Sequence, residues 1–382
     1  MKILYVCNNL ALPGNGISTS ARNITAALRK EGVEVRVLAG ENSNPDGIQP
    51  EYRLKHFYFP VFQPIIDANG FSYAAADKKI MREAVEWADI IHLEEPLPIE
   101  KMTMTMAQKM GKPVVGTFHM YTNNILSEIP CMNGRMQNAL LMHNWKRRHY
   151  NQMSDIQCPT EVVRQHLEDN HVKARLHVIS NGITIPEEKV VAKPWTGGPI
   201  NIIKVGRFVK IKCVELLLDA MPYSRHAKEI QLIYAGTGVL EKKLKARGEE
   251  LYAQGILAYK PKFVFLDNAG LKKLAQDSYL CVHSAKMEVE GLGCMEALRE
   301  GTVPVIAKGK YIGTSSYALD ERSVFPSGDA KALAEKIDWW IEHPEERNRM
   351  AQVYADKARE YDIQRSARSL IEMYRNAIEN NK

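Results

Sequence analysis

The sequence predicts two open α/β domains, each built around a parallel sheet. Short β-rich apolar runs alternate with helical periodicity from the first residue to about Met350, which is typical of parallel strands joined by crossover helices. The alternation lapses at residues 190–199, where the proline and glycine content indicates a linker. A chain of 382 residues is long enough for two domains, since one domain needs roughly 100 to 200 residues.

The first domain opens with a strand at residues 3–7, a helix at 18–31 and a second strand at 33–39. Ile24 and Leu28 fall on one face of this helix, and a glycine ends it. Later strands of the same sheet are predicted at residues 90–93, 113–118, 155–158 and 176–179.

The second domain begins with a strand at residues 200–205 and a helix at 214–221. Further strands are predicted at residues 231–235, 264–266, 280–283 and 303–307. The last residues, about 45 of them, have helical periodicity interrupted at Pro344 and no strand pattern, so we expect packing helices.

Composition and charge exclude several classes of protein. With 45% hydrophobic and 25% charged residues the chain is of average globular composition, and no apolar run approaches the roughly 18 to 20 residues of a membrane span. The net charge of +6 is small for a nucleic-acid binder and fits anionic small ligands or a lipid surface, so no nucleic-acid partner is expected. The six cysteines lie far apart without a Cys-x-x-Cys pair, which predicts neither a zinc site nor a disulfide framework. The first apolar run is too short for a signal peptide, and we expect a cytoplasmic protein.

The first candidate site is the glycine loop between the first strand and its helix. Gly14 and Gly16 would let backbone amides approach a phosphate at the positive end of the helix. An ordinary turn with Ser18 or Thr19 as the N-cap is the alternative. A nicotinamide-dependent oxidoreductase would use the same glycines with Glu41 after the second strand, and this loop alone leaves it open.

Two turns of the second domain also follow strands. Arg207 comes just after a strand and Lys212 five residues later, so both cations could meet one anionic group. A solvated loop is the alternative. Gly236, in a Gly-Thr-Gly turn after the next strand, is a weaker signal of the same kind.

The most informative segment starts at Glu288 and enters a helix that contains Glu296. Gly291 and Gly293 at the helix start would leave backbone amides open to an anion, and the two carboxylates can accept hydrogen bonds from sugar or ribose hydroxyls. Pairing of Glu296 with Arg299 within the helix is the alternative.

Residues 288–307 resemble the Glu-x7-Glu signature of retaining nucleotide-sugar glycosyltransferases of family 4, which have the GT-B fold. The signature continues as Glu-Ala-x-x-x-Gly-x-Pro-Val, matched here by Glu296, Ala297, Gly301, Pro304 and Val305. The other motifs follow in family order over most of the chain, at Gly16, Thr117 to His119, Asn181-Gly182, Gly206-Arg207 with Lys212, and Gly236-x-Gly238.

The resemblance implies two Rossmann-like, doubly wound domains that face each other across a cleft, with the C-terminal helix crossing back to the first domain. The acceptor-side domain would span residues 1–193, with residues 361–382 packing back on it. The donor domain, which binds the nucleotide-sugar, would span residues 199–360.

The resemblance also implies the roles of the candidate residues. Arg207 and Lys212 would bind the donor diphosphate, Glu288 the hydroxyls of the transferred sugar and Glu296 the ribose. His119 would contact the sugar near its anomeric carbon, with a histidine satisfied at a strand end as the alternative. The remaining donor contacts would come from Gly16, from Gly236 and residues 267–273 near the base, and from the amides of Glu290, Gly291, Leu292 and Gly293.

Three positions depart from the family pattern. Cys213 stands where the family has a glycine after the lysine, and Thr237 stands where it has an aspartate. The Gly-Gly that follows the Pro-Val strand is missing from residues 308–313.

The sequence therefore predicts a retaining hexosyltransferase that uses a nucleotide diphosphate sugar. The chain contains no Asp-x-Asp triplet, so we expect no bound metal and no other cofactor. A catalytically silent nucleotide-sugar sensor and the nicotinamide-dependent oxidoreductase are the alternatives.

The acceptor stays open between a membrane lipid, a cell-envelope glycan, and a soluble sugar or peptide. Residues 138–150 combine Leu140, Leu141 and Trp145 with three consecutive cations, Lys146 to Arg148. This pattern suits an anionic membrane surface, which would place the protein peripherally on the cytoplasmic membrane face. A helix buried on one side and solvated on the other is the alternative.

Overall fold

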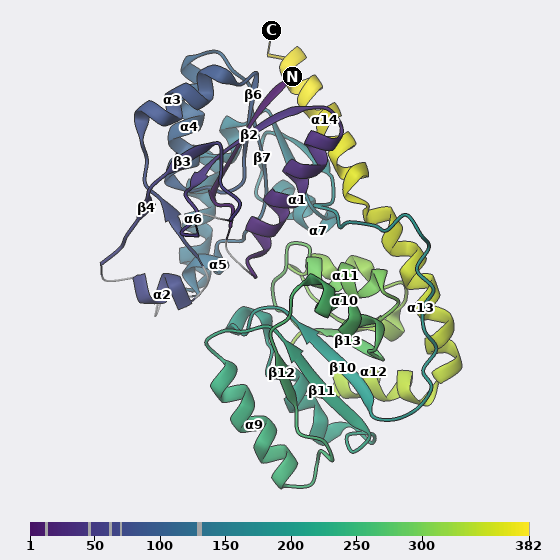
Figure 1. Ribbon diagram of the computed structural model, residues 1–382. Helices are drawn as coiled ribbons and strands as arrows, with labels where there is room; N and C mark the ends of the chain where they lie inside the picture. Colours follow the sequence, from purple (N-terminus) through teal and green to yellow (C-terminus); the bar gives the residue numbers. More distant parts are fainter. Residues whose placement is uncertain (12–13, 45–46, 61–62, 69–70, 128–131, 382) are drawn as a thin grey trace. The chain divides into compact units, whose positions relative to one another are not determined.

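The computed structural model describes residues 1–11, 14–44, 47–60, 63–68, 71–127 and 132–381, which form two compact units (Figure 1). Unit 1 comprises Met1–Gly182 and Ile363–Lys382, and unit 2 comprises Ile183–Asp362. Each unit is an α/β structure around its own sheet, which confirms the predicted fold class.

Over the described residues, unit 1 contains a seven-stranded sheet in the order β3-β2-β1-β6-β7-β8-β9, and neighbouring strands are parallel. The order reverses beside β1, as in doubly wound folds, whose ligands bind beyond the carboxyl ends of the strands. The strands are β1 (Lys2–Asn9), β2 (Glu34–Gly40), β3 (Tyr52–Leu54), β6 (Ile90–Leu93), β7 (Val114–Thr117), β8 (Asp155–Cys158) and β9 (Arg175–Val178).

The last helix of the chain, α14 (Ile363–Glu379), completes the core of unit 1. Tyr374 and its buried neighbours pack with Ile3 and Tyr5 of β1 and with Leu28 of α1 (Gly16–Lys30). Figure 1 shows α14 beside α1, so the predicted return of the C-terminal helix is confirmed. The other elements are β4 (His56–Phe57) paired with β5 (Tyr73–Ala74), α2 (Gln63–Ala68), α3 (Lys78–Trp87), α4 (Pro98–Lys109), α5 (Asn123–Leu126), α6 (Arg135–Arg148) and α7 (Glu161–Asp169).

Unit 2 contains a six-stranded sheet over its described residues, in the order β12-β11-β10-β13-β14-β15, again with parallel neighbours. Its strands are β10 (Ile200–Val205), β11 (Ile230–Ala235), β12 (Lys262–Val264), β13 (Leu280–His283), β14 (Val303–Lys308) and β15 (Val324–Pro326). Its α-helices are α8 (Leu216–Ala220), α9 (Glu241–Ala253), α10 (Asn268–Gln276), α11 (Leu292–Arg299), α12 (Ala330–Glu342) and α13 (Pro344–Ala358). None of the described helices of the chain is long and apolar enough to cross a membrane.

The predicted linker at residues 190–199 forms neither helix nor strand and packs on unit 2. The Ala192 amide donates to Gln352 Oε1 at 3.1 Å, and the Trp195 amide donates to Asn348 Oδ1 at 3.2 Å. Both acceptors belong to α13, so the first part of this segment, up to Trp195, is hydrogen-bonded to that helix.

The predicted strands are present within two residues at each end, but two helix predictions need correction. The helix predicted at 214–221 is only α8, because Cys213 has a left-handed backbone with φ of 44° and interrupts the turn before it. The first helix starts at Gly16 rather than at residue 18, and its N-cap is Asn15 rather than Ser18 or Thr19.

Candidate active site

The loops after β10 and β13 bring two predicted residues together in unit 2. Lys212 ends a short 3-10 turn after β10, and Glu288 follows β13. The Lys212 ammonium donates a short hydrogen bond to Glu288 Oε2, although 76 residues separate the two along the chain. His283 Nε2, at the end of β13, lies 3.3 Å from the same oxygen. The Glu288 carboxylate is therefore held between an ammonium and an imidazole.

Glu288 is ionised and His283 is neutral at pH 7. Burial alone would raise the pKa of Glu288, but Lys212 and His283 outweigh it and hold that pKa well below its ordinary range. Burial is the main cause that lowers the pKa of His283 to about 4. One carboxylate and one ammonium thus form a largely buried ion pair beside a neutral imidazole.

A second ammonium, that of Lys204 in β10, interacts electrostatically with Lys212 and Glu288. The Lys204 side chain is 1% exposed, and no described residue forms a hydrogen bond or ion pair with its ammonium. Burial, and then repulsion by Lys212, lower the pKa of Lys204 to about 8. Half-buried Arg207 adds a third cation two residues after β10. Because buried charges need counter-charges, this end of β10 suits an anionic ligand.

The helix α11 starts beside this cluster without a side-chain cap. Its N-cap is Gly291, with φ of +79°, where a Cβ atom would lie 2.4 Å from Thr314 Cγ2. A Cβ atom on Gly293 would lie 3.1 Å from Val205 Cγ1, so the helix start packs on the end of β10. Amides at such a start, Leu292 and Gly293 among them, present partial positive charge to a ligand. Glu290, just before the start, is 2% exposed.

Glu296 lies one turn into α11 and is not paired with Arg299. Arg299 acts on Glu296 through its charge, but its guanidinium lies 2.7 Å from Glu300 Oε1, so Arg299 forms its close ion pair with Glu300 and not with Glu296. Burial raises the pKa of Glu296. Its carboxyl group is therefore a largely buried hydrogen-bonding group whose nearest cation is engaged elsewhere.

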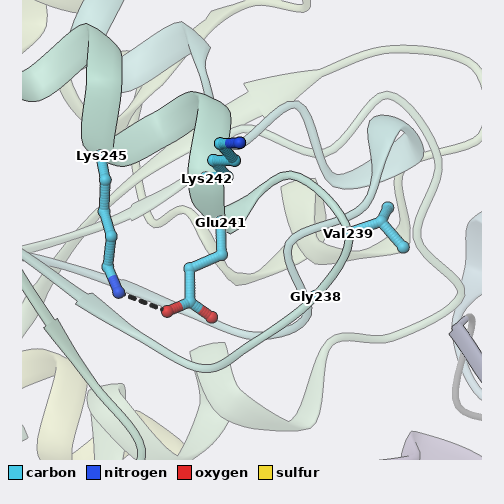
Figure 2. Close-up of a pocket in the computed structure, with 5 residues that line it drawn as sticks. All are labelled: Gly238, Val239, Glu241, Lys242 and Lys245. Carbon is cyan, nitrogen blue, oxygen red and sulfur yellow. Dashed lines mark hydrogen bonds and ion pairs between the residues drawn. The ribbon is translucent and has the colours of Figure 1, made fainter.

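Gly236 shapes the backbone around Arg207. It has a φ of +153°, and a Cβ atom there would lie 2.1 Å from Gly206 O. The Gly206 amide donates to Ala235 O at 3.0 Å, so the two turns lie against each other. Beyond this contact is a shallow hollow of about 490 Å³ (Figure 2), lined by Gly238, Val239, Glu241, Lys242 and Lys245.

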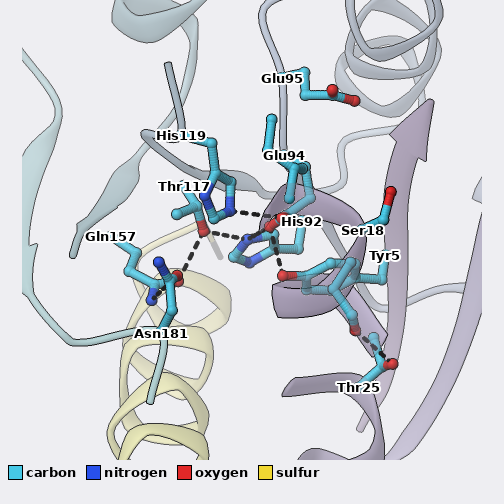
Figure 3. Close-up of polar contacts among 12 residues, drawn as sticks. Tyr5, Ser18, Thr25, His92, Glu94, Glu95, Thr117, His119, Gln157 and Asn181 are labelled. Atoms are coloured by element: carbon cyan, nitrogen blue, oxygen red, sulfur yellow. Dashed lines mark hydrogen bonds and ion pairs between the residues drawn. The ribbon is translucent and has the colours of Figure 1, made fainter. Parts of the chain in front are cut away.

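The candidate residues of unit 1 are His119 and Gly16. His119, just after β7, has its Nε2 atom 2.6 Å from Glu94 Oε2 (Figure 3). Glu94 follows the neighbouring strand β6 and is fully buried. The sequence analysis did not select Glu94, although a run of polar residues directly after a buried strand is a signal for the functional edge of a parallel sheet.

Gly16 begins α1, and the amides after it already have a partner. Asn15 Oδ1 accepts from the amides of Ile17 and Ser18 at 2.9 and 3.2 Å. Part of the predicted glycine loop, Leu12 and Pro13, lies outside the described residues. Donor contact at Gly16 therefore stays a prediction.

Two family models match most of the chain. The model of glycosyltransferase family 4 matches residues 14–185, and that of glycosyl transferases group 1 matches residues 187–356. These matches decide against the nicotinamide-dependent oxidoreductase that the glycine loop left open.

Two curated relatives act on lipids by name. The alpha-monoglucosyldiacylglycerol synthase of Streptococcus pneumoniae is 22% identical over 77% of this chain and 68% of its own length. The phosphatidyl-myo-inositol mannosyltransferase of Mycobacterium leprae is 24% identical over 98% of this chain and 96% of its own.

Two solved structures share the fold over the whole chain. Sucrose-phosphate synthase from Thermosynechococcus elongatus matches with a TM-score of 0.76 at 17% identity, covering 99% of each chain. Anabaena HepE in complex with UDP-glucose matches with a TM-score of 0.69 at 16% identity, covering 98% of this chain and 100% of its own. The chain therefore belongs to glycosyltransferase family 4, and its two units have the GT-B fold of such enzymes.

Proposed function

We propose that the protein transfers a hexose from a nucleoside diphosphate sugar to an acceptor with retention of configuration and without a metal. The observation that carries this proposal is the cation-rich end of β10: Lys204 lies in the strand, Arg207 and Lys212 follow it, and the uncapped start of α11 packs on the last residue of the strand, Val205. Fixed cations and helix-start amides can stabilise a departing diphosphate by several kcal/mol in a water-poor site, which leaves no need for a metal ion there.

In the proposed reaction, the bond between the anomeric carbon and the diphosphate oxygen breaks while the acceptor oxygen attacks on the same face. The acceptor's proton passes to the leaving diphosphate, whose charge Arg207 and Lys212 balance. Glu288 would accept hydrogen bonds from hydroxyls of the transferred sugar, Glu296 from the ribose, and His119 would contact the sugar near its anomeric carbon.

Incubation with UDP- and GDP-sugars tests the proposal. We expect slow nucleotide release with one donor and without an acceptor, unchanged by a chelator, and an α-anomeric product from an α-anomeric donor in proton NMR. Donor binding without any release would favour the sensor instead. A β-anomeric product would overturn retention, and activity that a chelator abolishes and a divalent cation restores would overturn metal independence.

We also propose that the acceptor is a lipid headgroup and that the helix α6 rests on the membrane surface. The two lipid-acting relatives support the acceptor class. On α6, Met136 and Leu140 are 69% and 63% exposed and share one face with exposed Arg147, at spacings of four and seven residues. An apolar and cationic face of this kind suits an anionic bilayer. Trp145, counted in this face from the sequence, is buried in the structure, which corrects that part of the prediction.

Sedimentation with vesicles that contain an anionic lipid tests the membrane contact. We expect Leu140→Asp to lower the fraction of protein bound to vesicles about tenfold. The change removes an apolar side chain that would insert into the bilayer and adds a negative charge that the anionic lipid repels. Val191→Asp is the matched control, because Val191 is 79% exposed and lies in unit 2. Equal losses for both variants, or none for Leu140→Asp, would contradict the proposed contact.

A further inference from the structure

Glu94 is the centre of a buried hydrogen-bond network in unit 1 (Figure 3). Its Oε2 atom faces His119 Nε2 at 2.6 Å. Its Oε1 atom accepts from the Tyr5 hydroxyl at 2.5 Å and lies 3.2 Å from His92 Nε2. We call this set the Glu94 network; its members, from β1, β6, β7, β8, the segments after β6 and β7, and α14, are Tyr5, His92, Glu94, Thr117, His119, Gln157 and Tyr374.

The hydrogen bonds fix where each proton of the network lies. Gln157 Nε2 donates to Ile179 O at 3.0 Å, which leaves Gln157 Oε1 to accept from the Thr117 hydroxyl at 2.7 Å. Thr117 Oγ1 must then accept from His92 Nε2, which lies 2.8 Å away. His92 carries its proton on Nε2, and its Nδ1 accepts from the Tyr374 hydroxyl at 2.9 Å.

Two groups with protons therefore face the Glu94 carboxylate. Tyr5 donates to Oε1, and Oε2 faces His119 Nε2. The one ring proton of His92 goes instead to Thr117, which leaves His92 as a neutral neighbour 3.2 Å from Oε1. Burial would raise the pKa of Glu94, but His119 and His92 outweigh burial and place that pKa well below its ordinary range. Burial also lowers the pKa of His92, which keeps it neutral. Glu94 is thus an ionised acceptor, and His119 Nε2 must carry a proton.

A fully buried carboxylate is costly to keep, since its desolvation is repaid only when all its hydrogen bonds are made. Replacing it with an apolar side chain would be the cheaper solution for stability alone. His119 is the most exposed member of the network, with a side chain that is 5% exposed, whereas the other members are 0 to 3% exposed. The feature that the network controls is therefore the orientation and protonation of His119.

We propose that Glu94 is a positioning residue for His119: its carboxylate holds the imidazole by Nε2, keeps that atom protonated, and so sets how His119 meets the donor sugar. The proposal rests on the proposed function, because the contact between His119 and the donor sugar is itself part of that proposed function. Glu94 itself touches no substrate in this scheme. It acts through His119, as carboxylates act on catalytic and metal-binding histidines.

Glu94→Gln tests the proposal, because glutamine keeps the shape and removes the charge. With the donor that the wild type hydrolyses or transfers, we expect kcat to fall about 10- to 100-fold while KM for the donor changes less than about threefold. In the His119→Asn background the same change should cost nothing further, since the residue through which it acts is gone. If the double variant instead lost kcat by the product of the two single-variant losses, the residues would act independently and the proposal would be overturned.

Glu95→Gln is the matched control. Glu95 is the next residue and is also buried, at 3% exposure, but it accepts hydrogen bonds from Asn8, and it acts on His119 only through its charge. We expect wild-type kcat for this variant. An equal loss in both variants would show that any buried acid of this edge matters, and would overturn a specific role for Glu94.

Nitrogen NMR of histidine-labelled protein gives a readout that needs no activity. We expect a protonated Nε2 for His119 in the wild type and a changed tautomer or protonation in Glu94→Gln, with His119→Asn assigning the signal. Tyr5→Phe, which removes one donor to the same carboxylate and leaves its charge, should shift the His119 signal less, and it serves if Glu94→Gln does not fold. An inactive wild type with the expected spectra would defeat the proposed function and leave the pairing intact; unchanged spectra would defeat the pairing.

Discussion

The two units hold their candidate residues by different physical means. In unit 1, His119 Nε2 lies 2.6 Å from the Glu94 carboxylate, and that carboxylate belongs to a set of buried side-chain contacts that crosses four strands. In unit 2, glycines without side chains let turns approach one another, and the buried ammonium of Lys204 forms no direct ion pair with a described residue, although the charge of Glu288 acts on it. A balanced network can orient a group, whereas an unbalanced set of cations is built to receive an anion. On the proposed function, unit 1 would orient His119 and unit 2 would stabilise the charge of the leaving diphosphate.

The largest expected effect is on the backbone approach in unit 2. Gly236→Ala would place a Cβ atom 2.1 Å from Gly206 O, and its φ of +153° disfavours any side chain. We expect a loss of about 4 kcal/mol in the free energy of unfolding, measured by denaturant titration. Gly255→Ala is the control, since Gly255 also has a positive φ but no atom within 4 Å of its Cβ position. A loss no larger than that of the control would mean that the turns can separate at little cost.

The buried ammonium of Lys204 should lower the stability of the protein that it equips for binding. The pKa of Lys204 falls from 10.5 to about 8 on burial, so the folded state is penalised as the pH falls from about 10.5 to about 8, and the full penalty persists below that. We expect Lys204→Met to raise the free energy of unfolding at pH 7 by up to about 3 kcal/mol, and the gain to vanish toward pH 10.5.

The same variant should bind nucleoside diphosphate more weakly at pH 7, as calorimetry would show. If Lys204→Met bound the nucleoside diphosphate with unchanged affinity, Lys204 would not contribute to binding the ligand. A pH-independent difference in stability would show that repacking, rather than charge, is responsible.

Removal of a cation from the loop after β10 should lower activity strongly. For Arg207→Ala and Lys212→Ala we expect kcat/KM to fall by about two orders of magnitude, because each charge would meet the transition state. Lys210→Ala is the control, since Lys210 is exposed and belongs to the same 3-10 turn as Lys212. Near-normal activity in both test variants would contradict the proposal that Arg207 and Lys212 stabilise the charge of the leaving diphosphate.

The smallest effect is expected at the far end of the Glu94 network. Tyr374→Phe removes the hydroxyl that donates to His92 Nδ1 and leaves a buried acceptor unsatisfied. We expect a loss of about 1 to 2 kcal/mol in the free energy of unfolding and less than a threefold change in kcat. A large loss of kcat with little loss of stability would show that unit 1 contributes more than the orientation of His119.

Much of the fold could be predicted from the sequence because buried parallel strands are continuous apolar runs. The edge strands β3 and β15 could not be predicted, since each has only three residues and therefore no apolar run long enough to indicate a strand. The start of α1 was misplaced because glycine gives no helix signal, although Asn15 before it is a good N-cap. The interruption at Cys213 follows from its backbone conformation, which residue type alone does not predict.

Only those residues of the candidate site that belong to sequence motifs could be predicted from the sequence. The motifs include Lys212 and Glu288, and the structure shows the two in contact. Lys204 lies inside an apolar run, where its side chain cannot be assigned to core or ligand from sequence. The role of Glu94 depends on partners from several strands and from α14, and such long-range pairing has no local pattern.

The place of α14 in unit 1 has a consequence for how the chain folds as it is made. Residues 183–362, which form unit 2 on their own, leave the ribosome before residues 363–379 can cover β1 and α1. The unit that begins the chain is therefore the last to close its core, against the usual order in which N-terminal domains finish first. Until residues 363–379 have left the ribosome, Ile3, Tyr5 and Leu28 lack their partners on α14, and nascent chains stopped before residue 363 should be targets for chaperones and proteases.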